Sequence, residues 1–421
     1  MKERVKLNFQ EQEIDGLIVN EDSNYLKVKL NNGYNLNLDK TRIEILERNK
    51  VEVEEKVSEG EGEVEDSGRP NIAILHTGGT IASKVDYNTG AVNAQFSPEE
   101  LLNLFPELAK KADISTKALG NLFSEDFRFS HYNLILEYIE KVIREENVEG
   151  VIVSHGTDTM HYSAAALNYA MENLKVPVIL VGAQRSSDRP SSDAYTNLNA
   201  AVDFIIENSK KEKKYSRVGI CMHSGISDDE MMLIDGINSK KAHTSRRDAF
   251  KQLNHLEVAR INREGEINIL REELFKEPET QDLKINYFDE NVKLGFFKSH
   301  PNVFPQEISN LSIYDAVVIE GTGLGHLGVD VVDESTKVHQ EVLEELEKVS
   351  KNTYLIMASQ CDEGEINLYV YSSGRKLLEL GVYGNYFNLT PETMFARVAY
   401  ILSRKEDFDE LWNQDLEKLN N

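Results

Sequence analysis

Two segments rich in glycine and threonine follow apolar runs and could present hydroxyl groups for chemistry. They are HTGGTIAS at 76–83 and VIVSHGTDTM at 151–160. A hydroxyl becomes a good nucleophile only when a base takes its proton. If both segments leave the same edge of one parallel sheet, Thr80 and Thr157 present their hydroxyls to one pocket. Asp158 would bring a carboxylate to the same place.

Two residue types could supply the base that such a hydroxyl needs. His76 and His155 stand beside the motifs, so a Ser/Thr–His–Asp triad is one possibility. Both, however, precede their loops within the apolar runs, which favours orienting or space-filling roles. A lysine serves as a base when burial or a neighbouring cation lowers its pKa. Lys241, in the segment NSKKAHTSRRDAFK, is the candidate, although most lysines, like the adjacent Lys240, are solvated.

Phosphate-binding alternatives fit these patterns poorly. HTGGTIAS lacks the Gly-Lys-Ser/Thr that completes a phosphate-binding P-loop. The segment GLGHLG at 323–328 matches GxGxxG and follows an apolar run. A dinucleotide site also needs a helix that opens at the third glycine and a second strand that ends in an acidic residue about 20 positions on. Neither signal is present, so we expect a turn there.

Composition and charge restrict the remaining functions. The 421 residues predict two or three domains, and the net charge of −25 opposes nucleic-acid binding as the main activity. The chain has no apolar run long enough to span a membrane, and its first residues lack the apolar core of a signal peptide. We therefore expect a cytoplasmic protein. Cys221 and Cys361 lie in apolar runs, which predicts small buried residues rather than a disulfide or zinc site.

The order of apolar and amphipathic segments predicts an α/β fold. From Pro70, short apolar runs alternate with helical patterns, as in a mostly parallel sheet covered on both faces. We expect a larger α/β domain at 70–275 and a smaller α/β domain at 285–421 that completes the active site. An acidic tract at 49–69 reads as a linker. Residues 1–48 show the period-2 pattern of a small antiparallel β-barrel.

Three local signals mark turns and helix starts. Asn32-Gly33 separates two alternating runs and predicts a β-hairpin. Ser97-Pro98-Glu99-Glu100 is a capping box that predicts a helix start. Thr390-Pro391 predicts the start of the final long helix.

The two motifs together resemble the signature pair of the L-asparaginase/glutaminase amidohydrolases. Three further segments support the resemblance, which extends from Pro70 to the C-terminus: LFSEDF, PVILVGAQRSSD and KKAHTSRRDAFK. It implies an asparaginase-like fold and hydrolysis of a side-chain amide without a metal or cofactor in this chain. Thr80 then matches the nucleophile. Thr157, Asp158 and Lys241 match a set in which lysine and aspartate activate a threonine hydroxyl.

The resemblance also implies how substrate is held. Ser124 matches the serine that binds the substrate α-carboxylate, and Asp158 contacts the α-ammonium group. Gly79 lets backbone donors approach the amide, and Tyr87 corresponds to a lid-loop tyrosine that assists Thr80. Glu125 stands where secreted members have glutamine. The family recruits an acid from the neighbouring subunit, for which Glu363 or Glu365 is a candidate.

Four features indicate one branch of this family: the N-terminal β unit, the acidic linker, and the segments TGGTIASKVDYNTGAV and AQRSSDRPSSDAYTNL. They are similar to the D subunits of archaeal glutamyl-tRNA(Gln) amidotransferases, ATP-dependent ligase complexes. The resemblance implies a glutaminase subunit that passes ammonia to an E subunit, which converts Glu-tRNA(Gln) to Gln-tRNA(Gln). It further implies a D₂E₂ heterotetramer around a D homodimer. ATP and Mg²⁺ are then expected in the partner, which also holds most of the tRNA.

Two other functions remain open on sequence grounds. One is a stand-alone cytoplasmic L-asparaginase/glutaminase with an accessory N-terminal domain. The other is an RNA-binding module at residues 1–48, with the amidohydrolase secondary. Lysines occur throughout that segment, but acidic residues dilute them: Lys2, Lys6, Lys27, Lys29 and Lys40. The preferred amide and the threonine that attacks first also stay open.

Overall fold

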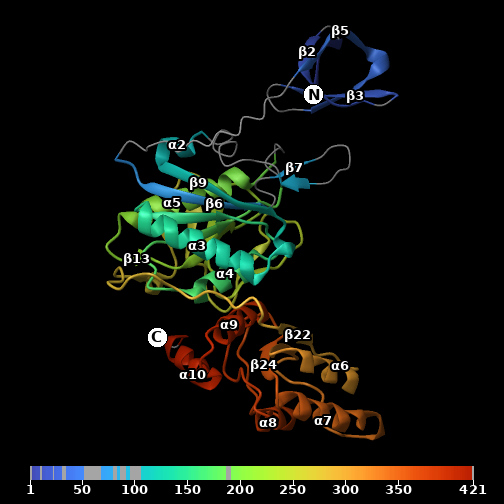
Figure 1. Ribbon diagram of the computed structural model, residues 1–421, viewed down its shortest axis with the longest axis vertical. Coiled ribbons are helices and arrows are strands. Elements are labelled where there is room, and N and C mark those ends of the chain that lie inside the picture. The colour runs from blue at the N-terminus through green and yellow to red at the C-terminus, as the bar shows by residue number, and fades with distance from the viewer. Residues whose placement is uncertain are drawn as a thin grey trace. The chain divides into compact units, whose positions relative to one another are not determined.

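The computed structural model divides the chain into two compact units (Figure 1). The first comprises Met1–Asp66 with Val85–Ala91, and the second Ser67–Lys84 with Val92–Asn421. The structure describes residues 2–9, 12–21, 23–30, 35–51, 68–78, 83–85, 92–94, 106–185 and 191–419.

The first unit is one antiparallel sheet of five strands in the order β4-β3-β2-β1-β5. The strands are β1 (Lys2–Phe9), β2 (Gln12–Glu21), β3 (Tyr25–Leu30), β4 (Asn35–Asp39) and β5 (Ile43–Val51). A 3₁₀ turn at Lys40–Arg42 links β4 to β5. Alternate side chains gather in a small core of Val5, Leu7, Leu26, Val28 and Leu38. β3 pairs with β4 as the hairpin prediction required, and Asn32-Gly33 itself lies outside the described residues.

An eight-stranded sheet forms the centre of the second unit, in the order β19-β18-β15-β14-β12-β10-β6-β9. From β9 to β14 all strands are parallel, whereas β15, β18 and β19 are antiparallel. The α/β prediction is therefore confirmed, with an antiparallel extension that the sequence did not indicate. The strands are β6 (Asn71–Gly78), β9 (Asp113–Leu122), β10 (Gly150–Ser154), β12 (Val178–Val181), β14 (Val218–His223), β15 (Glu230–Asp235), β18 (Ala259–Asn262) and β19 (Ile267–Ile269).

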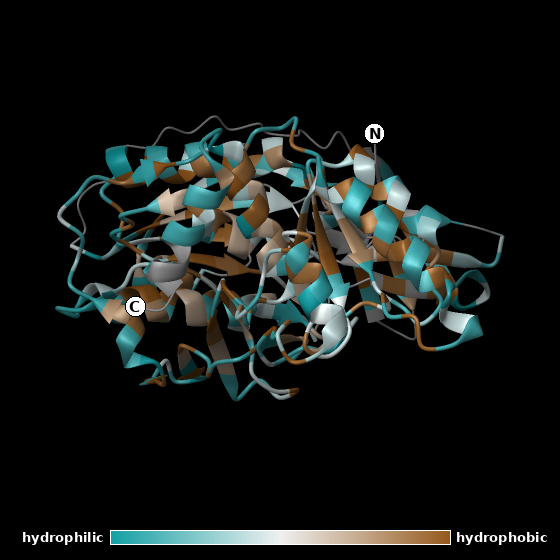
Figure 2. Cartoon of the chain, turned by 90° about the horizontal axis from the view of Figure 1, so that it is seen from below, coloured by the Kyte–Doolittle hydropathy of each residue, from teal (hydrophilic) through white to brown (hydrophobic). Residues whose placement is uncertain are grey.

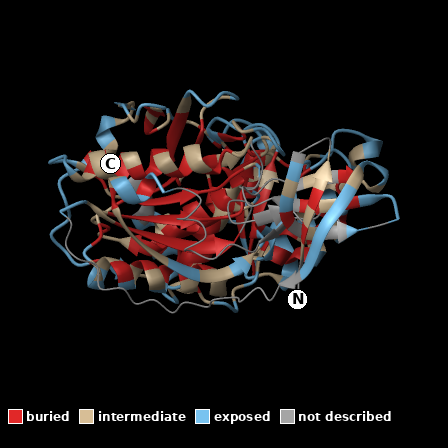
Figure 3. Cartoon of the chain, turned by 90° about the horizontal axis from the view of Figure 1, so that it is seen from above, coloured by how far each residue is buried: buried red, intermediate tan, exposed pale blue. Residues whose placement is uncertain are grey.

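Helices cover both faces of this sheet. Because side chains alternate along a strand, Ala73 and Leu75 of β6 enter the core beneath α3 (Phe129–Glu145) and α4 (Met160–Ala170). Ile72 and Ile74 point to the opposite face, beneath α5 (Ala194–Ser209). Figure 3 shows the buried strands between these layers, and Figure 2 shows apolar strands flanked by helices with hydrophilic outer faces. Continuous apolar strands are typical of a sheet buried on both sides.

A smaller three-stranded parallel sheet follows, in the order β22-β23-β24. Its strands are β22 (Leu294–Lys298), β23 (Ala316–Gly321) and β24 (Tyr354–Ser359). The helices around it are α6 (Pro305–Ser309), α7 (Val338–Ser350), α8 (Ser372–Glu379), α9 (Pro391–Ser403) and α10 (Phe408–Leu419). The Thr390 side chain accepts from the backbone N–H of Thr393 at the start of α9, as the Thr-Pro signal predicted.

The remaining short elements lie in the second unit, apart from Val85 at the end of β7, which belongs to the first. They are β7 (Ser83–Val85), β8 (Val92–Ala94), α2 (Leu108–Lys111), β11 (Met171–Glu172), β13 (Lys214–Tyr215), β16 (Ser239–Lys241), β17 (Phe250–Gln252), β20 (Phe275–Lys276) and β21 (Lys284–Ile285). The helix start predicted at Ser97 lies outside the described residues. No helix in the described ranges is both long and apolar enough to cross a lipid bilayer.

Two remaining expectations had different outcomes. The GLGHLG segment forms a turn, in which Thr322 and His326 exchange backbone hydrogen bonds of 2.9 Å. The next long helix begins only at Val338, so the prediction of a turn is confirmed. The prediction that both cysteines are buried is wrong for Cys361. Its apolar run ends with β24 at Ser359, and Cys361 lies in the exposed loop that follows.

Candidate active site

The candidate site lies at the carboxyl ends of β6 and β10, which are parallel neighbours. His76 is in register with Ser154, so both loops leave the same edge of the sheet. The Thr77 hydroxyl donates to the Ser154 carbonyl over 2.8 Å and ties the two strand ends together. Gly78 has φ of +114°, and a Cβ there would lie 2.5 Å from the backbone N of Leu122. Glycine is therefore needed where the first loop begins.

Lys241 connects the second loop to β16. Its Nζ lies 2.8 Å from Thr157 Oγ1 and 2.5 Å from Asp158 Oδ1. Thr157 is 6% exposed, and the Lys241 side chain is 8% exposed, whereas the Asp158 side chain is 66% exposed. The structure thus brings a buried hydroxyl, a buried amine and a solvent-facing carboxylate into one chain of contacts. Such a chain can move a proton away from a hydroxyl.

The LFSEDF segment packs directly against this loop. A Cβ at Gly156 would lie 2.9 Å from Ser124 Cβ, and the Thr159 hydroxyl donates to the Ser124 carbonyl over 2.6 Å. The aromatic ring of Phe127 lies 4.4 Å from that of His155. Ser124 is buried beside the loop, and Glu125 is exposed in the same 3₁₀ turn.

Residues of the smaller sheet region hold the lysine strand in place. Asn238 accepts from the backbone N–H of Thr390 over 2.9 Å and donates from its side chain to the Asn388 carbonyl over 3.1 Å. The next residues along the chain form β16. Lys240 points away from Thr157, and its Nζ lies 2.8 Å from Asp362 Oδ1. The start of α9 and the loop after β24 therefore position Lys241.

The two histidines beside the motifs bond to groups other than Thr157. His155 Nδ1 bonds to the Gly156 carbonyl at 2.6 Å, and its Nε2 to the Ser163 hydroxyl at 2.9 Å. His76 Nδ1 bonds to the Ser154 hydroxyl. Burial lowers the pKa of His76 and of His155 from 6.5 to about 4. These contacts support the orienting roles expected for both histidines.

His161 is a third buried histidine close to the site. Burial, assisted by Lys240 and Lys241, lowers its pKa from 6.5 to about 3. All three imidazoles are therefore neutral near pH 7. Neutral rings add no positive charge beside Lys241.

Three predicted site residues, Gly79, Thr80 and Tyr87, lie outside the described residues. Glu363 and Glu365 are exposed in the loop after β24. Of the predicted residues that are described, Ser124, Thr157, Asp158 and Lys241 lie together.

Two supporting residues were not singled out by sequence reasoning. A Cβ at Gly182 would lie 2.7 Å from Thr157 Cγ2 and 2.5 Å from Met160 Cε, so the absent side chain makes room for the loop. Asn238, which anchors β16, was missed as well. In both cases the only sequence signal is a glycine or asparagine after a strand, which usually marks a turn.

Across the described ranges, no three histidine, cysteine, aspartate or glutamate side chains are grouped so that they could hold a metal ion.

Comparison with known families identifies the class of protein. Residues 71–274 match the Asparaginase, N-terminal family, and residues 293–413 match the Glutaminase/Asparaginase C-terminal domain family. The L-asparaginase of Thermococcus kodakarensis superposes with a TM-score of 0.68 at 22% identity, over 82% of this chain and 96% of that one. L-asparaginase I of Vibrio cholerae gives the same TM-score at 24% identity and the same coverages. The chain has the asparaginase fold and belongs to the asparaginase family.

Curated relatives define the subfamily more narrowly. The D subunit of glutamyl-tRNA(Gln) amidotransferase from Pyrococcus abyssi is 39% identical over 394 residues, which is 92% of this chain and 84% of that protein. The corresponding D subunit of Thermoplasma volcanium is 35% identical over 420 residues, 98% of this chain and 96% of that protein. The chain therefore belongs to the family of glutamyl-tRNA(Gln) amidotransferase D subunits, as its motifs implied.

Proposed function

We propose that the chain hydrolyses the side-chain amide of glutamine as the glutaminase subunit of a tRNA-dependent amidotransferase. The observation that carries this proposal is the Thr157–Lys241–Asp158 chain of contacts, with Ser124 packed beside it. The similarity to D subunits over more than nine-tenths of the chain supports the amidotransferase context. We assign the protein to the cytoplasm, where tRNA is charged.

The chemistry follows from the contacts of Lys241. We assign the nucleophile to Thr80, because its loop leaves β6 at the edge where Thr157 lies. Its oxygen attacks the amide carbon while its proton passes to the Thr157–Lys241–Asp158 relay. The C–N bond then breaks, and the relay returns the proton to the departing nitrogen, which leaves as ammonia. Water next cleaves the threonine ester by the same relay and releases glutamate.

Substrate positioning uses the polar groups around this relay. Asp158 Oδ1 faces Lys241, and the exposed carboxylate remains accessible to the substrate α-ammonium group. We propose that Ser124 binds the α-carboxylate of the substrate and that the adjacent Glu125 also contacts the substrate. Backbone N–H groups of the glycine loops, with that of Gly79 among them, would stabilise the oxyanion, and Tyr87 would assist Thr80. We also propose that a neighbouring copy of this chain contributes an acidic side chain to the site, either Glu363 or Glu365.

The ammonia then serves a partner. We propose an E-type subunit that binds ATP and Mg²⁺ and carries most of the tRNA, in a D₂E₂ heterotetramer built on a homodimer of this chain. The net charge of −25 supports this division, because a strongly acidic chain repels the phosphates of tRNA.

The test compares the chain alone with the chain plus an E-type subunit. Glutamine hydrolysis should rise at least tenfold when the partner, Glu-tRNA(Gln) and ATP are present. The second candidate is a stand-alone asparaginase, which the asparaginase fold favours. Full asparagine turnover by the lone chain, unchanged by partner and tRNA, would establish that alternative and overturn the subunit proposal.

A further inference from the structure

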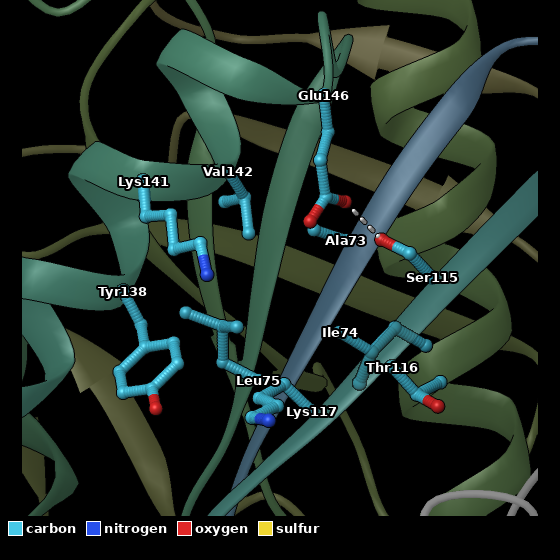
Figure 4. A pocket seen from close by; sticks show the side chains of 10 residues that line it. All are labelled: Ala73, Ile74, Leu75, Ser115, Thr116, Lys117, Tyr138, Lys141, Val142 and Glu146. Carbon is cyan, nitrogen blue, oxygen red and sulfur yellow. Dashed lines mark hydrogen bonds between the residues drawn. The ribbon is translucent and has the colours of Figure 1, made fainter. Parts of the chain in front are cut away.

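A groove of about 160 Å³ opens between β6, the edge strand β9 and helix α3 (Figure 4). The candidate active site lies beyond the carboxyl ends of the strands, whereas this groove runs along their helix-covered face. No residue of the Thr157–Lys241–Asp158 relay lines it. The side chains that matter for binding are Ser115, Lys117, Tyr138, Lys141 and Glu146.

Two lysines bring positive charge to the groove. Lys117 comes from β9 and Lys141 from α3, and Lys117 Nζ lies 5.9 Å from the centre of the Tyr138 ring. Neither lysine forms an ion pair with any residue that the structure describes, and both are exposed. The chain has 72 acidic against 47 basic residues, so most cations have carboxylates available to them. Two unpaired ammonium groups in one groove are suited to bind carboxylates.

A fixed carboxylate also lines the groove. Glu146 Oε2 accepts from the Ser115 hydroxyl over 2.7 Å. The Glu146 backbone carbonyl accepts from the Asn71 side chain over 2.7 Å, which anchors the residue at the end of α3. Figure 4 shows Glu146 and Ser115 together, separated along the groove from Tyr138 and Lys117. This carboxylate is suited to bind an ammonium group.

Three buried apolar side chains form the floor of the groove: Ala73, Leu75 and Val142. An engineered apolar cavity of about 150 Å³ holds benzene, so a groove of this size accepts a ligand of about that bulk. Drug-sized ligands need pockets of about 300 Å³ or more, which excludes a nucleotide.

From this arrangement we propose that the groove is a binding site for a free acidic amino acid, aspartate or glutamate. Two ammonium groups match the two carboxylates of the ligand, and Glu146 matches its ammonium group. The ligand's methylene groups contact the apolar floor. The groove carries a net charge of about +1 from these three side chains and the ligand about −1 at pH 7, so the complex is electrically balanced.

The test is equilibrium dialysis of labelled L-glutamate, and separately L-aspartate, against the full chain. The groove variant is Lys117→Met with Lys141→Met. The control is Lys348→Met with Lys351→Met, which removes the same charge from exposed positions on and just after α7. We expect the groove variant to bind one ligand fewer per chain than the wild type, and the control to bind as many. Each lysine should contribute about tenfold or more in affinity.

Because the comparison counts a difference of one ligand, it does not depend on whether the active site also retains glutamate. Equal stoichiometry in wild type and groove variant would overturn the proposal. N-acetyl-L-glutamate, which lacks the ammonium group, tests the ligand class on unmutated protein. It should fail to compete for the groove, and Glu146→Gln should weaken glutamate binding there. Equal competition by the acetylated acid would overturn the assignment of an amino acid.

Discussion

Gly182→Ala should disturb the candidate active site while changing the fold little. The new Cβ would lie 2.7 Å from Thr157 Cγ2 and 2.9 Å from the His155 carbonyl oxygen. Carbon atoms in ordinary contact are about 3.5–4.0 Å apart, so Thr157 must move by about 1 Å. A misplacement of about 1 Å costs on the order of 10²-fold in rate. That loss corresponds to about 2.7 kcal/mol in activation free energy. The overpacking should lower the free energy of unfolding by about 1–3 kcal/mol.

The assay is steady-state glutamine hydrolysis by the complete complex, followed by ammonia release, with urea unfolding measured in parallel. Gly225→Ala is the control, since a Cβ there would meet no atom of the described residues within 4 Å other than those of its chain neighbours. We expect kcat to fall about 10²-fold in the first variant and to stay within a factor of two or so in the control. A folded Gly182→Ala protein with unchanged kcat would refute the argument that the position of Thr157 limits hydrolysis.

Three further predictions concern stability and the residues around the loops. Thr77→Val removes the hydrogen bond to the Ser154 carbonyl and should cost about 1 kcal/mol in urea unfolding, with hydrolysis nearly unchanged; a complete loss of activity would instead make Thr77 functional. Asp193→Ala removes a buried carboxylate that accepts from two backbone N–H groups at 3.0 Å. Its unfolding free energy should fall by at least about 2 kcal/mol, and a change below 0.5 or so would contradict the contacts. His155 and His161 have folded pKa values of about 4 and 3, below the ordinary 6.5, so the unfolded chain takes up more protons on acidification. Between pH 6.5 and 5 each should remove about 1.5 kcal/mol of stability in total, because the unfolded imidazole goes from about half to almost fully protonated while the folded one stays neutral. A flat profile of unfolding free energy would argue against their burial as neutral rings.

Much of the fold could be predicted because apolar runs specify buried parallel strands. The runs around Ile74 and Ile152 are strands β6 and β10, and the Thr390 cap begins α9 as expected. The antiparallel strands β15, β18 and β19 were not predicted. β18 and β19 have only four and three residues, and the pairing of all three strands depends on neighbours distant in sequence rather than on local pattern.

The site residues likewise divide into those that a local motif predicts and those that only the tertiary structure identifies. Spacing alone placed Thr157 and Asp158 in one loop. The resemblance was needed to select Lys241, since Lys240 has the same chemistry one residue away. Only the tertiary structure distinguishes the two lysines, because Lys240 bonds to Asp362 and Lys241 bonds to Thr157. The prediction that Cys361 is buried was wrong for a related reason. An apolar run in the sequence does not show at which residue its strand leaves the core.

The most direct test of the account is ammonia release from glutamine by Lys241→Met, with Lys240→Met as the matched control. Lys241 is the group within 2.8 Å of the Thr157 hydroxyl, so its loss should lower kcat by about 10²–10⁴-fold at unchanged thermal stability. Lys240→Met should stay within about tenfold of wild type, because its ammonium group faces Asp362. A folded Lys241→Met enzyme that also stays within tenfold would contradict the proposed relay.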